Sequence, residues 1–554
     1  MACAVLSLGC PRSPTTAHPA ADAATTNAVA EPAPTAPAGL VATVLAPHPR
    51  SSGEAFAARS GLPVPMTLLL SVGVGVPMAV LGAVDLGRPA AACLFEDADG
   101  APSWALAMTP RTAAEARAAL GARYRLVPEP GVGERVASRE PAGQEPSLAC
   151  ALVTVRAAPA VRVVCAPTVA ALRTAARWTA WSVRDEAGGS DVRVEVADGG
   201  LQRLRARARE GSTALFAGWA EAASAERRAH DHPPDFGDPE AALALARRVR
   251  DEVDAALGEA RGVVLMMRVR DDGVGLYLAL DVPGDGTSSL ASDARARADV
   301  ELGDAARLRG WLAPDARVVG LVNTPGGGAR ALWTALVDAG LSVLGARVPD
   351  AVAARRVLAQ LGAEAGPALA FGGIAADDVR GGDSGVAAAR GEWVAVIPQG
   401  DGGRSARTGL AALVTAPWLR AARVGGAGLR VTACGVDTWC VGHTGPTAVA
   451  ANTEPDAVLA LRDGVLVVAA GARPRGVLEG VEARRRAGSD VPTEDHDGAS
   501  AVLRLRGDEG AAGGALRAGY GSVRQGDAVH VEAGVAVPSW VLRLAGARVA
   551  RGLR

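Results

Sequence analysis

The chain has no lysine among its 554 residues, and all 58 of its basic residues are arginine. Isoleucine, asparagine, tyrosine and phenylalanine are also scarce, and these five residue types share AT-rich codons, so the bias is typical of a very GC-rich genome. Without lysine the chain cannot form a catalytic Schiff base, and it cannot supply the lysine of a P-loop or the ATP-binding lysine of a protein kinase. Three large classes of enzyme are therefore excluded.

Aromatic residues are also few, at 3% of the chain, and ten of them are tryptophan. Hydrophobic residues make up 49% of the chain, mostly alanine, valine and leucine, so the chain can bury a large core. Small side chains fill volume less well than large ones, so we expect stability to depend on the few aromatic anchors. The length of the chain predicts two or more domains.

Neither sign of charge is in excess, because 58 arginines face 59 acidic residues and the net charge is -1. No global field therefore favours nucleic acid or an anionic membrane surface. Two arginine-rich stretches, at residues 203–209 and 484–486, lie among acidic residues without neighbouring aromatic residues, which is typical of solvated helix faces. We therefore expect no nucleic-acid partner.

The first residues include a short apolar run, Ala-Val-Leu-Ser-Leu-Gly-Cys at residues 4–10, that is similar to a bacterial lipobox. In a lipobox, Cys10 would become the lipid-modified N-terminus of the mature protein. No basic residue precedes the run, and the run is shorter than a usual signal segment; a start site placed too late would explain both departures. The alternative is an ordinary disordered start. Residues 11–60 are dominated by proline, alanine, threonine and serine, which predicts a disordered tether.

Residues 61–84 form a stretch of 24 uncharged residues, long enough to cross a bilayer as a helix. Pro63, Pro65 and Pro77 would break such a helix, and the flanks lack the basic cluster that usually stops transfer through a membrane. We therefore predict a buried strand followed by a short helix at residues 78–84.

One helix and one hairpin are clear in the middle of the chain. The helix begins at Asp238, has Pro239 in its first turn and ends at Gly258, with apolar residues every four positions along one face. The hairpin joins residues 263–270 to residues 274–282 through an Asp-Asp-Gly turn. Single helices mixed with short strands and hairpins predict an α+β fold of mainly antiparallel sheet backed by helices.

Two parts of the sequence repeat one pattern of strand, helix, Gly-Ser-Asp loop and strand, at residues 162–196 and about 300 residues later at 464–505. A second pair of helices, opened by Pro110 and Pro349 and each closed by Leu-Gly, is offset by about 240 residues, which requires an insertion of about sixty residues. These repeats predict two related domains. We expect a signal-like segment at residues 1–10, a disordered tether at 11–60, a first α+β domain at 61–236, a connecting helix at 237–262 and a second α+β domain with an insertion at 263–554.

Two pairs of cysteines have spacings that fit hairpins. Cys150 and Cys165 flank two short apolar segments around a proline-containing turn, so they can face each other across adjacent strands. Cys434 and Cys440 bracket a shorter loop with the same arrangement. Both pairs predict disulfide bonds, which need an oxidising compartment. The alternative is a set of buried thiols in a cytosolic protein, and Cys93 has no partner in either case.

The tetrad Gly-Asp-Ser-Gly at residues 382–385 matches the residues around the nucleophile of trypsin-like proteases, which would make Ser384 a catalytic serine. The match ends there, because neither the Gly-Pro that follows the tetrad in those proteases nor their upstream Ala-Ala-His-Cys motif is present. Coincidences of four residues are frequent in a chain with 68 glycines. Ser384 is therefore a candidate nucleophile without a recognisable catalytic context.

Two loops hold residues that can bind a metal ion or a phosphate. His230, His232 and Asp235 supply imidazole and carboxylate ligands within six residues, although a solvated linker before the next helix explains them equally. Residues 324–328 lie between a strand and a helix, but Pro325 removes one amide donor, so we interpret this glycine-rich stretch as a plain turn. We therefore expect no metal and no cofactor.

The Leu-Gly-Cys start, the tether and the stretch Ala-Val-Asp-Leu-Gly-Arg-Pro at residues 83–89 make the chain resemble the uncharacterised duplicated lipoproteins of very GC-rich Gram-negative bacteria. That resemblance implies no active site. We expect an exported protein of the periplasm or outer membrane, held by an N-terminal lipid anchor, with a non-enzymatic binding or structural role in the cell envelope. Its protein or small-molecule partner is not identified. The alternatives are an exported serine hydrolase that uses Ser384 and a cytosolic globular protein with a disordered N-terminus.

Overall fold

The computed structural model describes the chain from residue 34 to residue 543 with internal gaps. The gaps are residues 62–66, 68–69, 72–73, 138–147, 156–159, 186–188, 230–238, 315, 324–329, 331–332, 335–336, 339–340, 342–349, 375–390, 422, 425–426, 445–453, 488–500 and 507–514.

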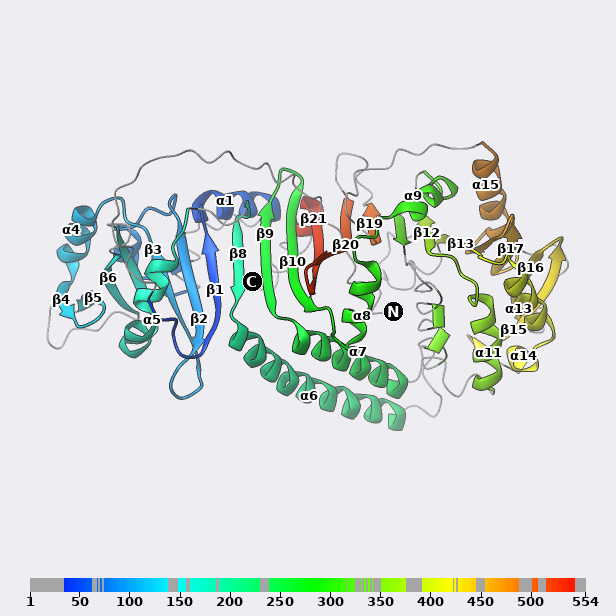
Figure 1. Ribbon diagram of the computed structural model, residues 1–554, viewed down its shortest axis with the longest axis horizontal. Coiled ribbons are helices and arrows are strands. Elements are labelled where there is room, and N and C mark those ends of the chain that lie inside the picture. The colour runs from blue at the N-terminus through cyan, green and yellow to red at the C-terminus, as the bar shows by residue number, and fades with distance from the viewer. Residues whose placement is uncertain are drawn as a thin grey trace.

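All strands of the described residues belong to one antiparallel sheet that runs along the length of the molecule (Figure 1). The half of this sheet formed by residues 40–283 is called the first half, and the half formed by residues 318–538 is called the second half. From its outer edge to the centre, the first half contributes β4 (Arg125–Glu129), β5 (Gly133–Ala137), β6 (Ala149–Val155), β7 (Ala160–Ala166), β3 (Pro102–Met108), β2 (Ala90–Glu96), β1 (Leu40–Ala46), β8 (Val192–Val196), β9 (Gly262–Val269) and β10 (Gly273–Pro283).

The second half continues the sheet from the centre to the opposite edge. Its strands are β21 (Ala528–Pro538), β20 (Ala515–Gln525), β19 (Ala501–Arg506), β11 (Val318–Asn323), β12 (Ala368–Ile374), β13 (Glu392–Pro398), β18 (Val465–Ala470), β17 (Ala457–Arg462), β16 (Thr438–Thr444), β15 (Ala427–Gly435) and β14 (Arg423–Val424). The C-terminal strands β20 and β21, red in Figure 1, therefore lie in the middle of the molecule beside β10.

Both halves place their strands in the same order. Counted outward from the centre, each strand of the first half has a counterpart in the second half. The first-half order is β10, β9, β8, β1, β2, β3, β7, β6, β5 and β4, and the corresponding second-half order is β21, β20, β19, β11, β12, β13, β18, β17, β16 and β15. The register matches as well. Leu278 of β10 lies opposite Ala533 of β21 at the centre. Following the residue opposite on each successive strand leads from Leu278 to Cys165 of β7 and from Ala533 to Leu466 of β18, so these residues occupy matching positions.

The two halves meet along β10 and β21, strands of 11 residues that pair over their whole length. The pairing extends from Gly273 opposite Pro538 to Pro283 opposite Ala528. An antiparallel pair has a local two-fold relation, so the matching strand orders continue outward from one symmetric join.

Helices cover both faces of the sheet. Those of the first half are α1 (Pro49–Ser60), α3 (Met78–Leu81), α4 (Ala113–Arg123), α5 (Val169–Ser182), α6 (Asp198–Ala229) and α7 (Pro239–Glu259). In the chain, the segment between β10 and β11 forms α8 (Ser289–Arg297), α9 (Gly303–Leu308) and the 3-10 turn η3 (Arg309–Trp311), of which α9 packs on β11 and β12 of the second half. The second half contains α11 (Ala351–Leu361), α13 (Arg404–Thr415), α14 (Pro417–Ala421) and α15 (Pro474–Ala487).

Each half buries an apolar core on both faces of its outer strands. In the first half, α5 packs on one face against Phe95 and Ala105, and α4 packs on the opposite face near Met108 and Val163. In the second half, α15 packs on one face, whereas α11 and α13 pack on the other. Alternate residues of one strand point to opposite faces, which is why a strand such as β3 supplies both cores of the first half.

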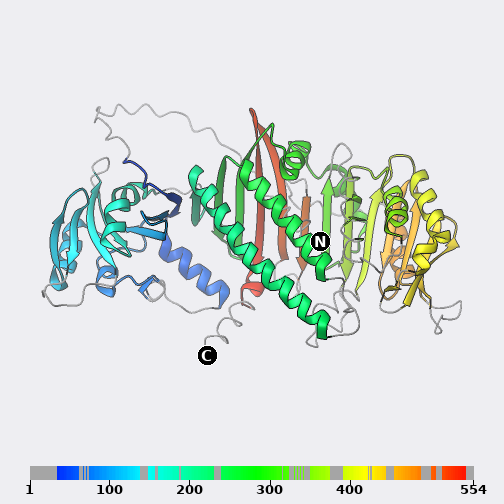
Figure 2. The ribbon, with the colours of Figure 1, turned by 90° about the horizontal axis from the view of Figure 1, so that it is seen from below.

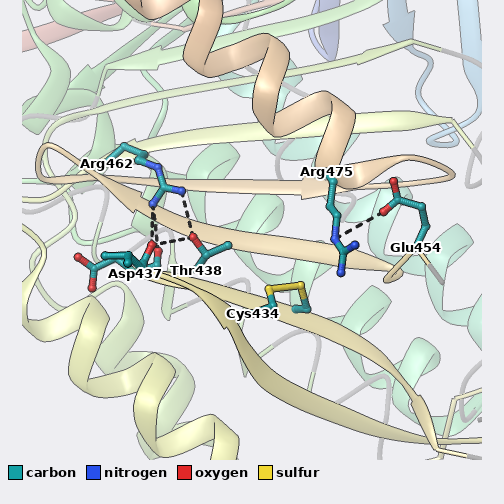
Figure 3. Close-up of a disulfide and its surroundings, with 8 residues drawn as sticks. Cys434, Asp437, Thr438, Glu454, Arg462 and Arg475 are labelled. Atoms are coloured by element: carbon teal, nitrogen blue, oxygen red, sulfur yellow. Dashed lines mark hydrogen bonds and ion pairs between the residues drawn. A yellow bond between two sulfur atoms is a disulfide. The ribbon is translucent and has the colours of Figure 1, made fainter. Parts of the chain in front are cut away.

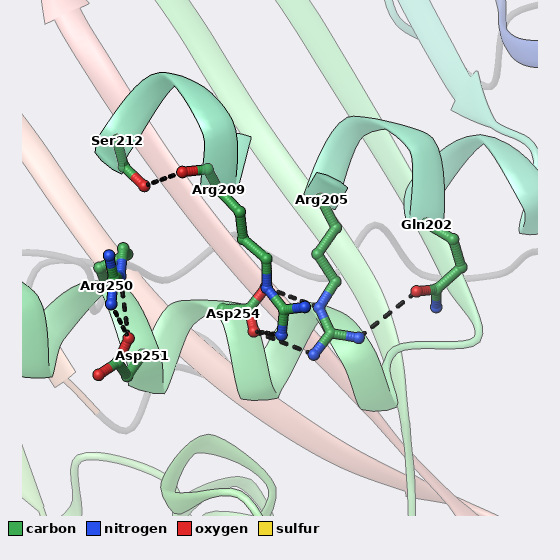
Figure 4. Close-up of polar contacts among 7 residues, drawn as sticks. All are labelled: Gln202, Arg205, Arg209, Ser212, Arg250, Asp251 and Asp254. Atoms are coloured by element: carbon green, nitrogen blue, oxygen red, sulfur yellow. Dashed lines mark hydrogen bonds and ion pairs between the residues drawn. The ribbon is translucent and has the colours of Figure 1, made fainter. Parts of the chain in front are cut away.

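The long helices α6 and α7 form an antiparallel pair that runs diagonally across the centre of the sheet (Figure 2). Asp254 of α7 joins them, because it accepts hydrogen bonds from the Nε atoms of Arg205 at 2.7 Å and Arg209 at 2.8 Å (Figure 4). These guanidinium groups hold the pKa of Asp254 far below its ordinary value. The arginines of residues 203–209, which we expected on a solvated face, therefore pair with acidic residues of α7 and β2.

Several expectations from the sequence agree with the structure. The fold is mixed, with helices packed on a large antiparallel sheet. The helix expected between residues 238 and 258 is α7, although its expected cap Asp238 lies outside the described residues. The hairpin expected from the Asp-Asp-Gly turn is β9 and β10. The short helix expected at residues 78–84 ends earlier, because α3 spans Met78–Leu81.

The expected boundaries differ from the structure in two places. Residues 40–60 were assigned to the disordered tether, but they form β1 and α1. The run Leu40–Ala46 is apolar and β-branched enough to pair with β2 and β8 at once, and long-range pairing overrides the local composition. The sheet also continues through the β8–β9 pair across the expected connecting helix, so the strands alone do not separate two domains.

The two repeats found in the sequence have different outcomes. The strand, helix and strand near residues 162–196 are β7, α5 and β8, and their expected counterparts are β18, α15 and β19, which occupy the same places in the second half. The helix pair opened by Pro110 and Pro349 was matched wrongly. Those helices are α4, which follows β3, and α11, which follows β11, so the helix in the place of α4 is α13.

Candidate functional site

The residues expected to carry chemistry lie largely outside the described part of the chain. Cys10 and Ser384 fall in segments that the structure does not describe, and so do the metal candidates His230, His232 and Asp235. The same holds for residues 324–328. The lipidation site, the candidate serine nucleophile and the candidate metal ligands therefore stay predictions.

Cys150 and Cys165 lie directly opposite each other on β6 and β7, with their Cα atoms 4.1 Å apart. Both side chains are buried beneath α4. Their sulfur atoms lie at disulfide distance, which is compatible with the bond expected from the sequence.

Cys434 and Cys440 also lie at disulfide distance, across the hairpin of β15 and β16 (Figure 3). The tip of this hairpin is held from two sides. Arg407 of α13 donates two hydrogen bonds of 2.7 Å to the carboxylate of Asp437, and Arg462 of β17 donates to the carbonyl oxygen of Asp437 at 3.3 Å. Each half of the sheet therefore has one pair of cysteines at disulfide distance in its outer strands.

Cys93, which we expected to have no cysteine partner, is a buried free thiol on β2. Its sulfur lies 3.0 Å from the hydroxyl of Thr179 on α5. Burial raises the pKa of the Cys93 thiol, so this cysteine stays protonated and unreactive near neutral pH.

A histidine with two carboxylates lies where the two halves join. His530 of β21 is directly opposite Asp281 of β10, with Nδ1 at 2.7 Å from the Asp281 carboxylate and Nε2 at 3.3 Å from the carboxylate of Glu532. The hydrogen bond to Glu532 and the contact with Asp281 raise the pKa of His530 to about 9. In the two-fold arrangement of β10 and β21, the residues that correspond to His530 and Asp281 are Gly275 and Ala536, which lie opposite each other and carry no charge. The ion pair is therefore not repeated at this symmetric position.

We expect the contribution of His530 to stability to decline in alkaline solution. Its pKa is about 9 in the folded chain and 6.5 when unfolded, so the stabilisation is complete below pH 6.5 and is lost as the pH rises through 9. The side chain is partly exposed, and we expect the loss to be about 1 kcal/mol after solvent screening. Urea denaturation at pH 6.5 and pH 9.5 measures it. His530→Gln should remove this part of the pH dependence, and equal pH dependence in both proteins would contradict the assignment.

One cavity of about 220 Å³ lies in the second half, between α15 and the strands β12 and β13. Its lining is formed largely by residues with little or no side chain, which are Gly372, Gly373, Gly476, Gly480, Ala313 and Ala316. A Cβ atom on Gly373 would point to the opposite face of the sheet from that of Gly372, where it would lie 2.5 Å from the ring of Trp393. The backbone and small side chains therefore leave a space that larger residues would fill.

Charged groups lie at this cavity. Nε of Arg473 donates to the carboxylate of Glu392 at 3.0 Å, and Nε of Arg484 donates to the carbonyl oxygen of Trp311 at 3.1 Å. Two guanidinium groups therefore line the cavity with one carboxylate. Such a lining has an excess positive charge and suits a small ligand with a negative group.

Sequence reasoning missed this cavity. Its residues come from segments around positions 313, 372, 392 and 476, which only the folded chain brings together. One local signal was present, because Gly372 and Gly373 lie side by side inside an apolar strand. Glycine within a strand marks a close approach of backbone or a missing side chain. Arg484, which was assigned to a solvated helix face, lines this cavity instead.

No group of three or more histidine, cysteine, aspartate or glutamate side chains in the described ranges is arranged to hold a metal ion. Within the same ranges, no helix has both the length and the apolar character needed to cross a bilayer.

The comparisons with known proteins add no relationship. No protein-family model, no curated protein and no solved structure matches this chain.

Proposed function

We propose that the protein is exported, is anchored to a membrane through a lipid on Cys10, and has a binding or structural role in the cell envelope. The observation that carries this proposal is the placement of both cysteine pairs at disulfide distance, one in the outer strands of each half. Disulfide bonds form and persist in oxidising compartments such as the periplasm. The periplasm or outer membrane is therefore the location that we propose.

We also infer that the two halves of the sheet are related domains that arose by duplication. The shared strand order and the shared register support this inference, as do the matching places of α4 with α13 and of α5 with α15. Joined through β10 and β21, the two halves form an elongated body whose ends lie far apart (Figure 1). An elongated body with cross-linked ends suits a structural element or a binding protein of the envelope.

The lipid anchor can be tested by metabolic labelling with an alkyne analogue of palmitate in a Gram-negative host. We expect the full chain to incorporate the label and to sediment with membranes, because Cys10 would carry the lipid. Cys10→Ala should lose the label completely and appear in the soluble fraction. Cys3→Ala is the matched control, since it removes a neighbouring cysteine and should stay labelled. Labelling that persists in Cys10→Ala would refute the anchor.

A further inference from the structure

The cavity of the second half has a filled counterpart in the first half. The register that relates the two halves matches Ala92 of β2 with Leu369 of β12. Phe95 and Gly372 each follow three residues later, so they occupy the same place on the same face of the sheet. Phe95 is 1% exposed and packs beneath α5, whereas Gly372 lines the cavity beneath α15. The second half therefore lacks the phenyl ring that fills this place in the first half.

The size of the cavity limits what can enter it. An apolar cavity of about 150 Å³ holds one benzene molecule. The present cavity, at about 220 Å³, has room for one aromatic ring and a small substituent. Val394 and Val477 supply the apolar surface that a ring would contact.

The charge at the cavity selects the substituent. The Arg473 side chain is exposed, and within the described part of the chain its Nε donates a hydrogen bond to Glu392. A guanidinium group has five N–H donors, so further donors of Arg473 can reach an incoming anion. A carboxylate attached to a ring in the cavity would meet a donor of opposite charge at the cavity wall.

We propose that this cavity binds a small carboxylate with a single aromatic ring, with the ring between α15 and the strands β12 and β13 and the carboxylate at Arg473. The ring takes the place that Phe95 fills in the first half. This binding site goes beyond the proposed envelope role and does not depend on the lipid anchor, so a failed labelling experiment with Cys10→Ala leaves it intact.

The probe is 4-fluorobenzoate, added to the full chain and followed by ¹⁹F NMR. We expect a saturable change of line width with the wild-type protein. 4-Fluorobenzyl alcohol has the same ring without the charge and should bind about tenfold more weakly, because a charge-assisted hydrogen bond is lost. Acetate, which has the charge without the ring, should not compete with the probe. No saturable binding of 4-fluorobenzoate to the wild-type protein would overturn the proposal.

Gly372→Phe tests the position of the site. A Cβ atom at Gly372 would lie 3.4 Å from the side chain of Leu312 and from the carbonyl oxygen of Val318, so the first atom of the new side chain fits at the short end of ordinary contact. We expect this variant to keep its melting temperature and to lose saturable binding. Gly442→Phe is the matched control, because nothing lies within 4 Å of a Cβ atom there, and it should bind as the wild type does. Wild-type affinity in Gly372→Phe would place the ligand elsewhere.

Arg473→Gln tests whether the guanidinium group binds the carboxylate. It also provides an independent test if Gly372→Phe fails to fold. The Arg473 side chain is 76% exposed, so its replacement should leave the fold intact. We expect the affinity for 4-fluorobenzoate to fall about tenfold while the affinity for 4-fluorobenzyl alcohol stays constant, since only the anion meets the guanidinium group. An equal loss for both probes, or no loss for either, would refute the assigned role of Arg473.

Discussion

Replacing Phe95 by alanine is expected to destabilise the protein by about 3–5 kcal/mol, the range typical of a fully buried phenylalanine. The side chain is 1% exposed and packs between β2 and α5, in a core made mostly of alanine and valine. Small neighbours cannot move far enough to refill the space of a lost ring, so a cavity remains. Urea denaturation followed by circular dichroism measures the change in the free energy of unfolding.

The matched control for Phe95→Ala is Phe56→Ala. Phe56 lies on α1 and is 36% exposed, so its truncation should cost far less. Hydrogen exchange adds a local readout, because the amides of α5 should lose protection in Phe95→Ala while those of α15 keep it. Equal destabilisation by the two substitutions would show that Phe95 does not anchor the core of the first half.

Reduction of the disulfide between Cys150 and Cys165 is expected to lower the free energy of unfolding by about 3 kcal/mol, because the bond closes a loop over a sequence separation of 15 residues. The bond between Cys434 and Cys440 spans 6 residues and should contribute about 2 kcal/mol by the same chain-entropy argument. The longer loop has more conformational freedom to lose, so the first bond should matter more.

Two double variants separate these contributions. Cys150→Ala with Cys165→Ala removes the first bond, and Cys434→Ala with Cys440→Ala removes the second. Each is compared with wild-type protein that was oxidised or refolded under reducing conditions. Reduction removes two bonds from the wild-type protein and one bond from each double variant. Reduction should therefore lower the free energy of unfolding more in the wild type than in either variant. A wild-type protein whose stability does not change on reduction would contradict the proposal that these bonds hold the outer strands.

The two halves carry different residues at matching places of the shared strand order. The pair Cys150 and Cys165 in the first half occupies the place of Leu461 and Leu466 in the second. In the same way, the buried ring of Phe95 corresponds to the glycine that opens the cavity. If the proposed site is correct, one backbone arrangement supports packing in the first half and binding in the second.

Part of this fold could be predicted from neighbouring residues alone. The hairpin of β9 and β10 follows from alternating apolar residues on both sides of Asp271 and Asp272, and α7 follows from its regular apolar spacing after Pro239. The cysteine pairs follow from spacing in the same way, since each pair is joined through its own hairpin. These signals are local, so they survive without knowledge of the rest of the chain.

Other features could not be predicted because they depend on distant segments. The assignment of residues 40–60 to a tether rested on composition, whereas β1 is held by β2 and β8, strands that lie about 50 and 150 residues later in the chain. The mistaken match of α4 with α11 rested on a shared Pro and Leu-Gly ending. Only the order of the surrounding strands shows that α13 is the helix that corresponds to α4.

The amino-acid sequence by itself determined which lysine-dependent chemistries are excluded, the positions of α7 and of the hairpin of β9 and β10, and which cysteines lie at disulfide distance. The tertiary structure alone decided that β10 pairs with β21. It also decided that Gly372 lines a cavity in the second half, whereas Phe95 fills the matching position in the first half. The reason is physical. Turns and helices depend on residues a few positions apart, whereas sheet order and cavities depend on which distant surfaces are buried together.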